Sequence, residues 1–194
     1  MMNIEETPKE RAENDDAILV PVHTLTLENG RTCTLYVGNL TGASDPQTML
    51  AENVTSSLNV SLNIHVPEVQ LPDGIHVRRA KVGLIDGEGN NVAHLAAAVL
   101  ALDGLVTQAS PGKPYYPAHR AGNVLVNCRG GRSRSVAVLA LYLHLKDPTA
   151  FPDFEKAVSH IRVLRDNGDH YPLPPMMALA DELLATGSLQ KLLS

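Results

Sequence analysis

The chain has 194 residues, 44% of them hydrophobic, which predicts one domain with a full core. Its formal net charge of −5 argues against a protein whose whole surface binds nucleic acid, although a local basic site is compatible with it. Its two cysteines, Cys33 and Cys128, are too few for a disulfide scaffold or a four-thiolate zinc site.

No segment has the features of a signal peptide, and no apolar run is long enough to be a transmembrane helix. We therefore expect a cytoplasmic protein with reduced thiols and no stable membrane insertion. Residues 1–17 are polar and show no apolar period, which predicts a flexible tail followed by one domain over residues 18–194.

Five segments of that domain alternate in polarity or are rich in apolar and β-branched residues, which indicates strands. In chain order they are 18–27, 33–37, 54–64, 75–85 and 123–127. Between the second and third lies a short helix over 44–53, with Ser44 or Asp45 as its cap.

Four longer segments carry helical signals, namely apolar residues at three- and four-residue steps, Pro near the start or Gly at the end. They are 92–109, 135–145, 147–167 and 172–187. Because strands and helices alternate, the predicted fold class is α/β, with a central, mostly parallel sheet flanked by helices.

One stretch, VLVNCRGGRSRSVAV over residues 124–138, combines a short apolar strand, a polar loop and an apolar helix. Ligands bind in α/β proteins where strands end and helices begin. Unpaired N–H groups and the helix dipole make a helix N-terminus attractive to anions. Gly130 and Gly131 allow the loop to curl, and Arg134 offers a planar fork for two phosphate oxygens. The loop therefore predicts a phosphate site.

The same surroundings favour a thiolate at Cys128, since the dipole, the loop N–H groups and the arginines all stabilise negative charge. A thiolate that faces a bound phosphate is a nucleophile for phosphoryl transfer. A redox-sensing cysteine needs the same low pKa and is an alternative interpretation. A core cysteine beside an arginine-bearing turn is another.

The loop, Cys-x5-Arg followed by Ser, resembles the signature loop of the cysteine-dependent protein tyrosine phosphatase superfamily. The short domain is most similar to the dual-specificity phosphatase-like branch. The segment CTLYVGNLTGASDPQTMLAENVTSSLNVS and residues 158–184 also resemble that branch, so the likeness covers about residues 30–185.

The resemblance implies a phosphatase that hydrolyses phosphate monoesters of proteins through a phosphocysteine intermediate, without metal or other cofactor. The implied catalytic residues are Cys128, Arg134, Asp86 and Ser135. The implied phosphate-binding residues are Arg129, Gly130, Gly131, Arg132, Ser133 and Arg134. Asp86 is the expected general acid because it follows a strand and precedes a helix, and Glu88 is the second candidate.

Two features depart from the family pattern. Asn127 precedes the cysteine where the family usually has His, which raises the alternative of a catalytically weak phosphate-binding pseudophosphatase. Arg129 and Arg132 add positive charge that resembles lipid-directed members, so a lipid or inositol phosphate is an alternative substrate. The expected partner is thus a phosphorylated protein or an anionic phosphate-bearing molecule or lipid head group, and not nucleic acid.

The proline-rich loop over 109–121 carries Tyr115, Tyr116 and His119. It is a candidate wall of the cleft, and a surface loop that closes over the core is an equal alternative. Rhodanese-like sulfur transfer and arsenate reduction are rival activities that also use a cysteine loop. Both fit poorly, because rhodanese-like loops usually lack the Arg-Ser ending and low-molecular-weight arsenate reductases have the cysteine near the N-terminus.

Overall fold

The computed structural model describes residues 6–110 and 112–193, and its centre is a sheet in the order β1-β2-β5-β3-β4. The strands are β1 (Leu19–Thr26), β2 (Thr32–Gly38), β3 (Val54–Ser61), β4 (Arg78–Leu84) and β5 (Asn123–Asn127). β1 runs antiparallel to β2, and the other neighbours are parallel. The predicted, mostly parallel sheet is confirmed.

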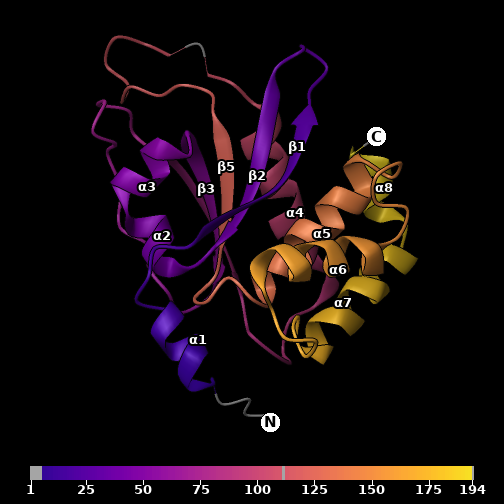
Figure 1. The fold of residues 1–194 in the computed structure, drawn as a ribbon. Helices are drawn as coiled ribbons and strands as arrows, with labels where there is room; N and C mark the ends of the chain where they lie inside the picture. The colour runs from indigo at the N-terminus through magenta and orange to yellow at the C-terminus, as the bar shows by residue number, and fades with distance from the viewer. Residues whose placement is uncertain (1–5, 111, 194) are drawn as a thin grey trace.

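Helices cover both faces of the sheet (Figure 1). One face carries α4 (Val92–Thr107), α5 (Arg134–Lys146), α6 (Phe154–Arg165), α7 (Pro174–Ala185) and α8 (Ser188–Leu193). The other face carries the short α2 (Leu40–Ser44) and α3 (Pro46–Ala51). Each face has its own apolar core, the larger one beneath α4 to α8. The α/β fold class is therefore confirmed.

Side-chain caps explain where most helices begin. Asp45 accepts hydrogen bonds from the backbone N–H groups of Gln47 and Thr48, and Asn91 forms a capping box with His94. In contrast, Ser133 makes no side-chain cap at the start of α5, although the first ten residues of that helix are buried. The N–H groups of the first turn of α5 are thus not blocked by a capping side chain.

Two short helices, α2 and α8, lie outside the predicted elements, because five or six residues are too few to show an apolar period. None of the helices in the described ranges is both long and apolar enough to cross a bilayer.

The N-terminal segment differs from the expected tail, since its described part contains α1 (Pro8–Glu13). α1 buries none of its residues, which is why the sequence shows no period there. Thr7 and Glu10 form a capping box, and the buried Asn39 donates hydrogen bonds to the carbonyls of Glu13 and Asp16. Polar contacts therefore hold this segment at the end of the sheet where β5 finishes (Figure 1).

The burial of α5 generates a stability prediction. Leu139 is fully buried on α5, so Leu139→Ala should lower the free energy of unfolding by about 2–5 kcal/mol. Leu192→Ala is the matched control, because Leu192 is 64% exposed. Urea denaturation measures both, and equal losses in the two variants would contradict the assigned core.

Candidate active site

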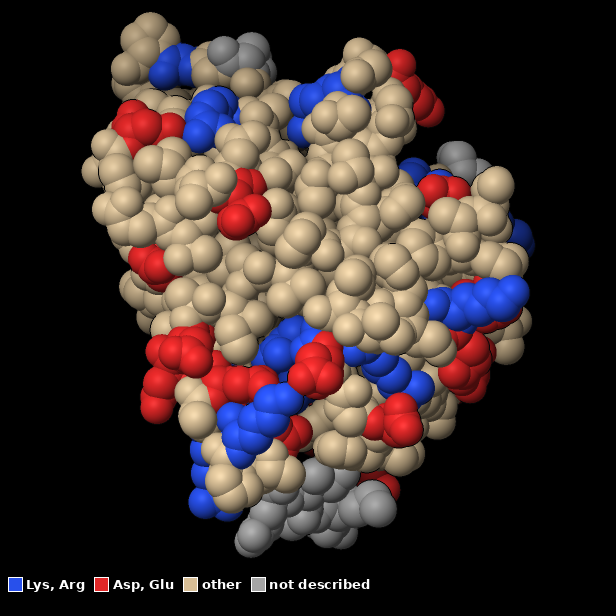
Figure 2. All heavy atoms as spheres, in the orientation of Figure 1, with Lys and Arg blue, Asp and Glu red and all other residues tan. Residues whose placement is uncertain are grey.

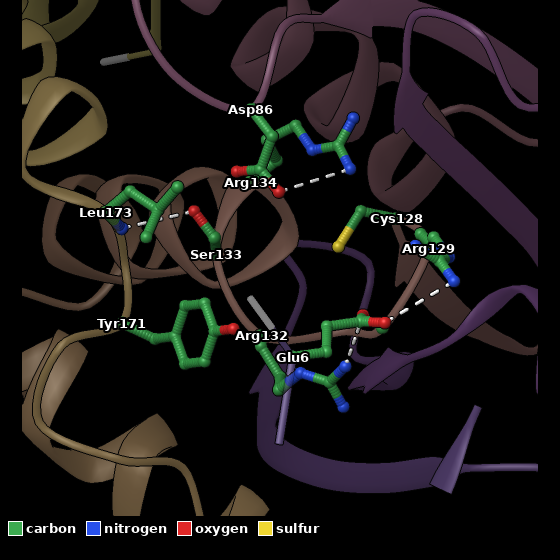
Figure 3. Close-up of a pocket in the computed structure, with 10 residues that line it drawn as sticks. Glu6, Asp86, Cys128, Arg129, Arg132, Ser133, Arg134, Tyr171 and Leu173 are labelled. Carbon is green, nitrogen blue, oxygen red and sulfur yellow. Dashed lines mark hydrogen bonds and ion pairs between the residues drawn. The ribbon is translucent and has the colours of Figure 1, made fainter. Parts of the chain in front are cut away.

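A cavity of about 290 Å³ opens at the carboxyl ends of the parallel strands (Figure 3). Its lining residues come from the loop after β5, the turn after β4, the segment before α7 and the N-terminal segment. They are Glu6, Asp86, Cys128, Arg129, Gly130, Arg132, Ser133, Arg134, Tyr171 and Leu173. The structure thus gathers most of the predicted site residues around one hollow.

Cys128 lies at the end of β5 and is 2% exposed. Its Sγ lies 3.3 Å from the Ser135 hydroxyl and accepts a 3.3 Å hydrogen bond from the backbone N–H of Gly131. Burial by itself raises the pKa of the thiol. The positive charge of Arg134 and the hydrogen bonds from Ser135 outweigh burial, and the pKa of Cys128 lies below its ordinary value.

Gly131 sets the curvature of the loop. It has a φ of +69°, and a Cβ at this position would lie 2.6 Å from the carbonyl oxygen of Gly38 on β2. Only glycine accepts both the left-handed conformation and this close approach without a shift of the backbone. The same turn directs the Gly131 N–H at the sulfur of Cys128.

Arg134 and Asp86 lie beside the sulfur and pair with each other, with 3.4 Å between Nη2 and Oδ2 (Figure 3). Arg134 also donates from Nη1 to the carbonyl of Leu84, and its buried Nε has no acceptor among the described residues. The guanidinium is therefore held in place by β4 while it keeps an unused donor. Because Arg134 also lines the cavity, its guanidinium can contact an anion that binds there.

The other loop residues have different surroundings. Ser133 lines the cavity, and its hydroxyl accepts a hydrogen bond from the backbone N–H of Leu173, which ties one wall to the loop. The Arg129 side chain is 58% exposed at the mouth. The guanidinium of Arg132, expected to hold substrate oxygens, instead contacts Glu6, Glu10 and Glu13. These contacts were not foreseen because they join residues far apart in the sequence.

Asn127 is fully buried and replaces the usual histidine with a neutral amide. Its Nδ2 donates a weak 3.4 Å hydrogen bond to the carbonyl of Cys128, and its Oδ1 has no partner among the described residues. Asn127 thus contacts the loop backbone but adds no charge near the thiol.

Two predicted contributors lie elsewhere. Glu88 lines a different cavity, with Asn90, Pro175 and Leu179, so of the two candidate acids only Asp86 lines the cavity of Cys128. The 109–121 loop is likewise absent from the lining. Its Ser110, Tyr116 and His119 line a separate cavity together with Arg78 and Arg79 from the start of β4. The loop is therefore not a wall of this cavity, and residue 111 lies outside the described residues.

Three lining residues are absent from the sequence expectations: Glu6, Tyr171 and Leu173. A signal for Glu6 was present, since Glu6, Glu10 and Glu13 recur at three- and four-residue steps and form an acidic stripe if residues 6–13 are helical. The segment with Tyr171 and Leu173 precedes α7, and no sequence pattern in it predicts that these residues line the cavity.

No protein-family model and no curated protein sequence matches the chain. Solved structures do. Human DUSP28 is similar over 80% of this chain and 94% of its own, at 24% identity and a TM-score of 0.60. The Yvh1 phosphatase domain from Chaetomium thermophilum is similar over 79% of this chain and 92% of its own, at 24% identity and a TM-score of 0.63. PTPMT1 in complex with PI(5)P is similar over 79% of this chain and 94% of its own, at 18% identity and a TM-score of 0.50.

These structures confirm the resemblance to dual-specificity phosphatases at the level of the fold. Identities of 18–24% carry no information on substrate or activity, which are argued from the site itself.

The lowered pKa of Cys128 is testable by alkylation. In a Cys33→Ser background, the rate of reaction with iodoacetamide should rise with pH through a midpoint below about 8.5, the value of a free thiol. The rate then falls only when the pH drops below that lowered pKa and the thiolate is protonated. Ser135→Ala should move the midpoint upward, because it removes a hydrogen bond to the sulfur. A midpoint at or above that of a free thiol would contradict the assigned electrostatics.

The Gly131 contact gives a second prediction. Gly30→Ala is the matched control, because Gly30 also has a positive φ but has no atom within 4 Å of the added Cβ. Gly30→Ala should cost about 1 kcal/mol of unfolding free energy, and Gly131→Ala at least about 2 kcal/mol. Binding of inorganic phosphate should weaken only in Gly131→Ala. If the two substitutions changed the unfolding free energy and the phosphate affinity equally, the close approach of Gly131 to Gly38 would be unimportant.

Proposed function

We propose that this chain is a cysteine-dependent phosphatase that hydrolyses phosphate monoesters. One observation carries the proposal: a buried Cys128 with a lowered pKa lies beside Arg134 at the start of a helix without a side-chain cap. Nucleophile and anion site thus share one cavity with the carboxyl group of Asp86. The fold supports the same conclusion, since its structural neighbours include phosphatases.

In the first proposed step, the thiolate of Cys128 attacks the phosphorus atom in line with the leaving oxygen. The P–S bond forms as the bond from phosphorus to the leaving oxygen breaks. Asp86 supplies the proton that this oxygen needs. Arg134 and the loop N–H groups stabilise the equatorial oxygens. A phosphocysteine and a free alcohol or phenol result.

In the second step, water attacks the phosphocysteine and gives a proton to Asp86, which is now a carboxylate. The P–S bond breaks, inorganic phosphate leaves and the thiolate is restored. The Ser135 hydroxyl, 3.3 Å from Sγ, donates a hydrogen bond to the departing sulfur. Both steps balance with water as the only co-reactant.

Phosphorylated tyrosine, serine or threonine residues of proteins are the proposed substrates. Extra positive charge on the loop would suit a lipid or inositol phosphate, but Arg132 is 5% exposed and surrounded by three glutamates. Its charge is therefore already balanced by the protein. This observation favours substrates with a single phosphate over polyphosphorylated head groups.

Turnover of two esters tests the mechanism. Cys128→Ser should abolish phosphate release from both an aryl and an alkyl phosphate. Asp86→Asn should lower kcat about 100-fold or more for the alkyl ester, whose leaving oxygen needs the proton, and much less for a nitrophenyl ester. Glu88→Gln is the matched control and should leave both rates unchanged. Phosphate binding without turnover in the wild type would instead favour a pseudophosphatase.

A further inference from the structure

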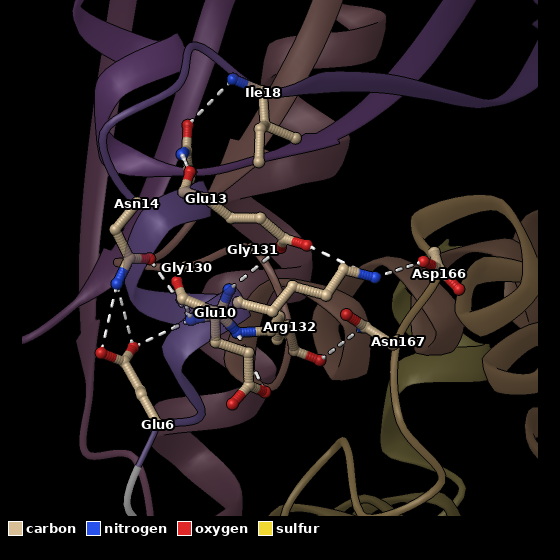
Figure 4. Close-up of polar contacts among 12 residues, drawn as sticks. Glu6, Glu10, Glu13, Asn14, Ile18, Gly130, Gly131, Arg132, Asp166 and Asn167 are labelled. Carbon is tan, nitrogen blue, oxygen red and sulfur yellow. Dashed lines mark hydrogen bonds and ion pairs between the residues drawn. The ribbon is translucent and has the colours of Figure 1, made fainter.

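Three glutamates near the N-terminus, Glu6, Glu10 and Glu13, converge on the signature loop, and we call them the acidic arm (Figure 4). All three form ion pairs with Arg132, at 2.9 Å from Glu6, 3.7 Å from Glu10 and 3.4 Å from Glu13. Asn14 accepts a further hydrogen bond from Arg132. Each of the three guanidinium nitrogens is therefore paired with a group of the protein itself: Nη1 with Glu13, Nη2 with Glu6, and Nε with Glu10.

Burial makes these contacts hard to replace. The side chains of Arg132 and Arg165 are each 5% exposed. Arg165 donates to Glu13 at 3.0 Å and to the carbonyl of Gly130 at 3.2 Å. Removing the partner of a buried cation leaves an uncompensated charge, which is strongly unfavourable. The acidic arm is thus a component of the loop structure.

Glu6 differs from the other two members of the arm because it lines the cavity that contains Cys128 (Figure 3). Glu10 and Glu13 line another cavity, behind Arg132, together with Asn167. Glu6 also pairs with the half-exposed Arg129 at 3.4 Å. One carboxylate therefore lies at the mouth of the site and engages both arginines that flank the loop glycines.

The charges at the mouth are consequently balanced. Figure 2 shows acidic and basic side chains interleaved over the lower part of this face, around α1, whereas the area above it is mostly uncharged. A phosphate bound at Cys128 would meet Arg134 and the loop backbone that leads into α5. A second anionic group just outside would meet Glu6, and would find Arg129 and Arg132 already paired.

Resting on the proposed function, we infer that Glu6 is a specificity-determining residue. It favours monoesters in which the substrate group next to the phosphate is neutral or cationic. It disfavours substrates with a second anionic group beside the phosphate. The arginine-rich loop alone suggests the opposite preference.

Two aryl phosphates of nearly equal shape test this inference: para-carbamoylphenyl phosphate, whose substituent is neutral, and para-carboxyphenyl phosphate, whose substituent is anionic. Their dissociation constants are measured by calorimetry in a Cys128→Ser background, which holds the ligands without turnover. The parent should bind the neutral ester more tightly. Adding Glu6→Gln should reduce that preference about fivefold, the effect of a partly exposed charge pair of about 1 kcal/mol.

Asp15→Asn is the matched control, because it removes one negative charge from the same segment at an exposed position. The preference of Asp15→Asn for the neutral ester over the anionic ester should equal that of the parent. If Glu6→Gln left the ratio of the two dissociation constants unchanged, or lowered the affinity for both esters equally, the inference would be overturned and Glu6 would have a purely structural role. The preference should also shrink as salt is raised.

The same two esters separate this inference from the proposed function when kcat/KM is measured with Cys128 present. If both esters were turned over and Glu6→Gln left the ratio of their kcat/KM values unchanged, the inference on Glu6 would be contradicted but the proposed phosphatase activity would not. Absence of turnover, with the binding preference still dependent on Glu6, would contradict the phosphatase activity and support the inference.

Discussion

A negative charge on a buried sulfur is the constraint on which the rest of this site depends. Burial opposes ionisation of Cys128, whereas Arg134 and Ser135 in the first turn of α5 lower the pKa of the thiol below its ordinary value, and the N–H of Gly131 donates a further hydrogen bond to the sulfur. β5 and α5 must therefore meet at a short, sharply curved loop. The contact between Gly131 and Gly38 fixes that curvature, and the apolar packing around α5 fixes the helix itself.

The positive charges that surround the loop create a second constraint. Arg132 and Arg165 are nearly inaccessible to water, and cations in such positions require partners. A helix with no buried residue supplies them through its glutamates. Arg132, one of the additional arginines of the loop, thus attaches the N-terminal segment to the site. The same attachment brings Glu6 to the mouth and connects structural ion pairs with substrate choice.

Much of this arrangement was predictable, because it depends on local patterns. The strand-loop-helix around Cys128 is visible as an apolar run, two glycines and a second apolar run. It predicted the fold class, which the structure confirms, and it makes Cys128 the proposed nucleophile. Asp86 was predictable from its place after a strand. The partners of Arg132 were not, since the spacing of Glu6, Glu10 and Glu13 does not say that they pair with an arginine 119 to 126 residues away. The position of the 109–121 loop was left open between a wall of the cleft and a surface loop, because its composition does not say which end of the sheet it covers.

Identification of the covalent intermediate tests the central claim most directly. The enzyme is mixed with an aryl phosphate, quenched in acid within the first turnovers and analysed by intact-protein and peptide mass spectrometry. We expect one added phosphoryl group, located on Cys128 and absent from Cys128→Ser. Phosphate release with no such adduct, or an adduct on another residue, would contradict the assignment of Cys128 as the nucleophile.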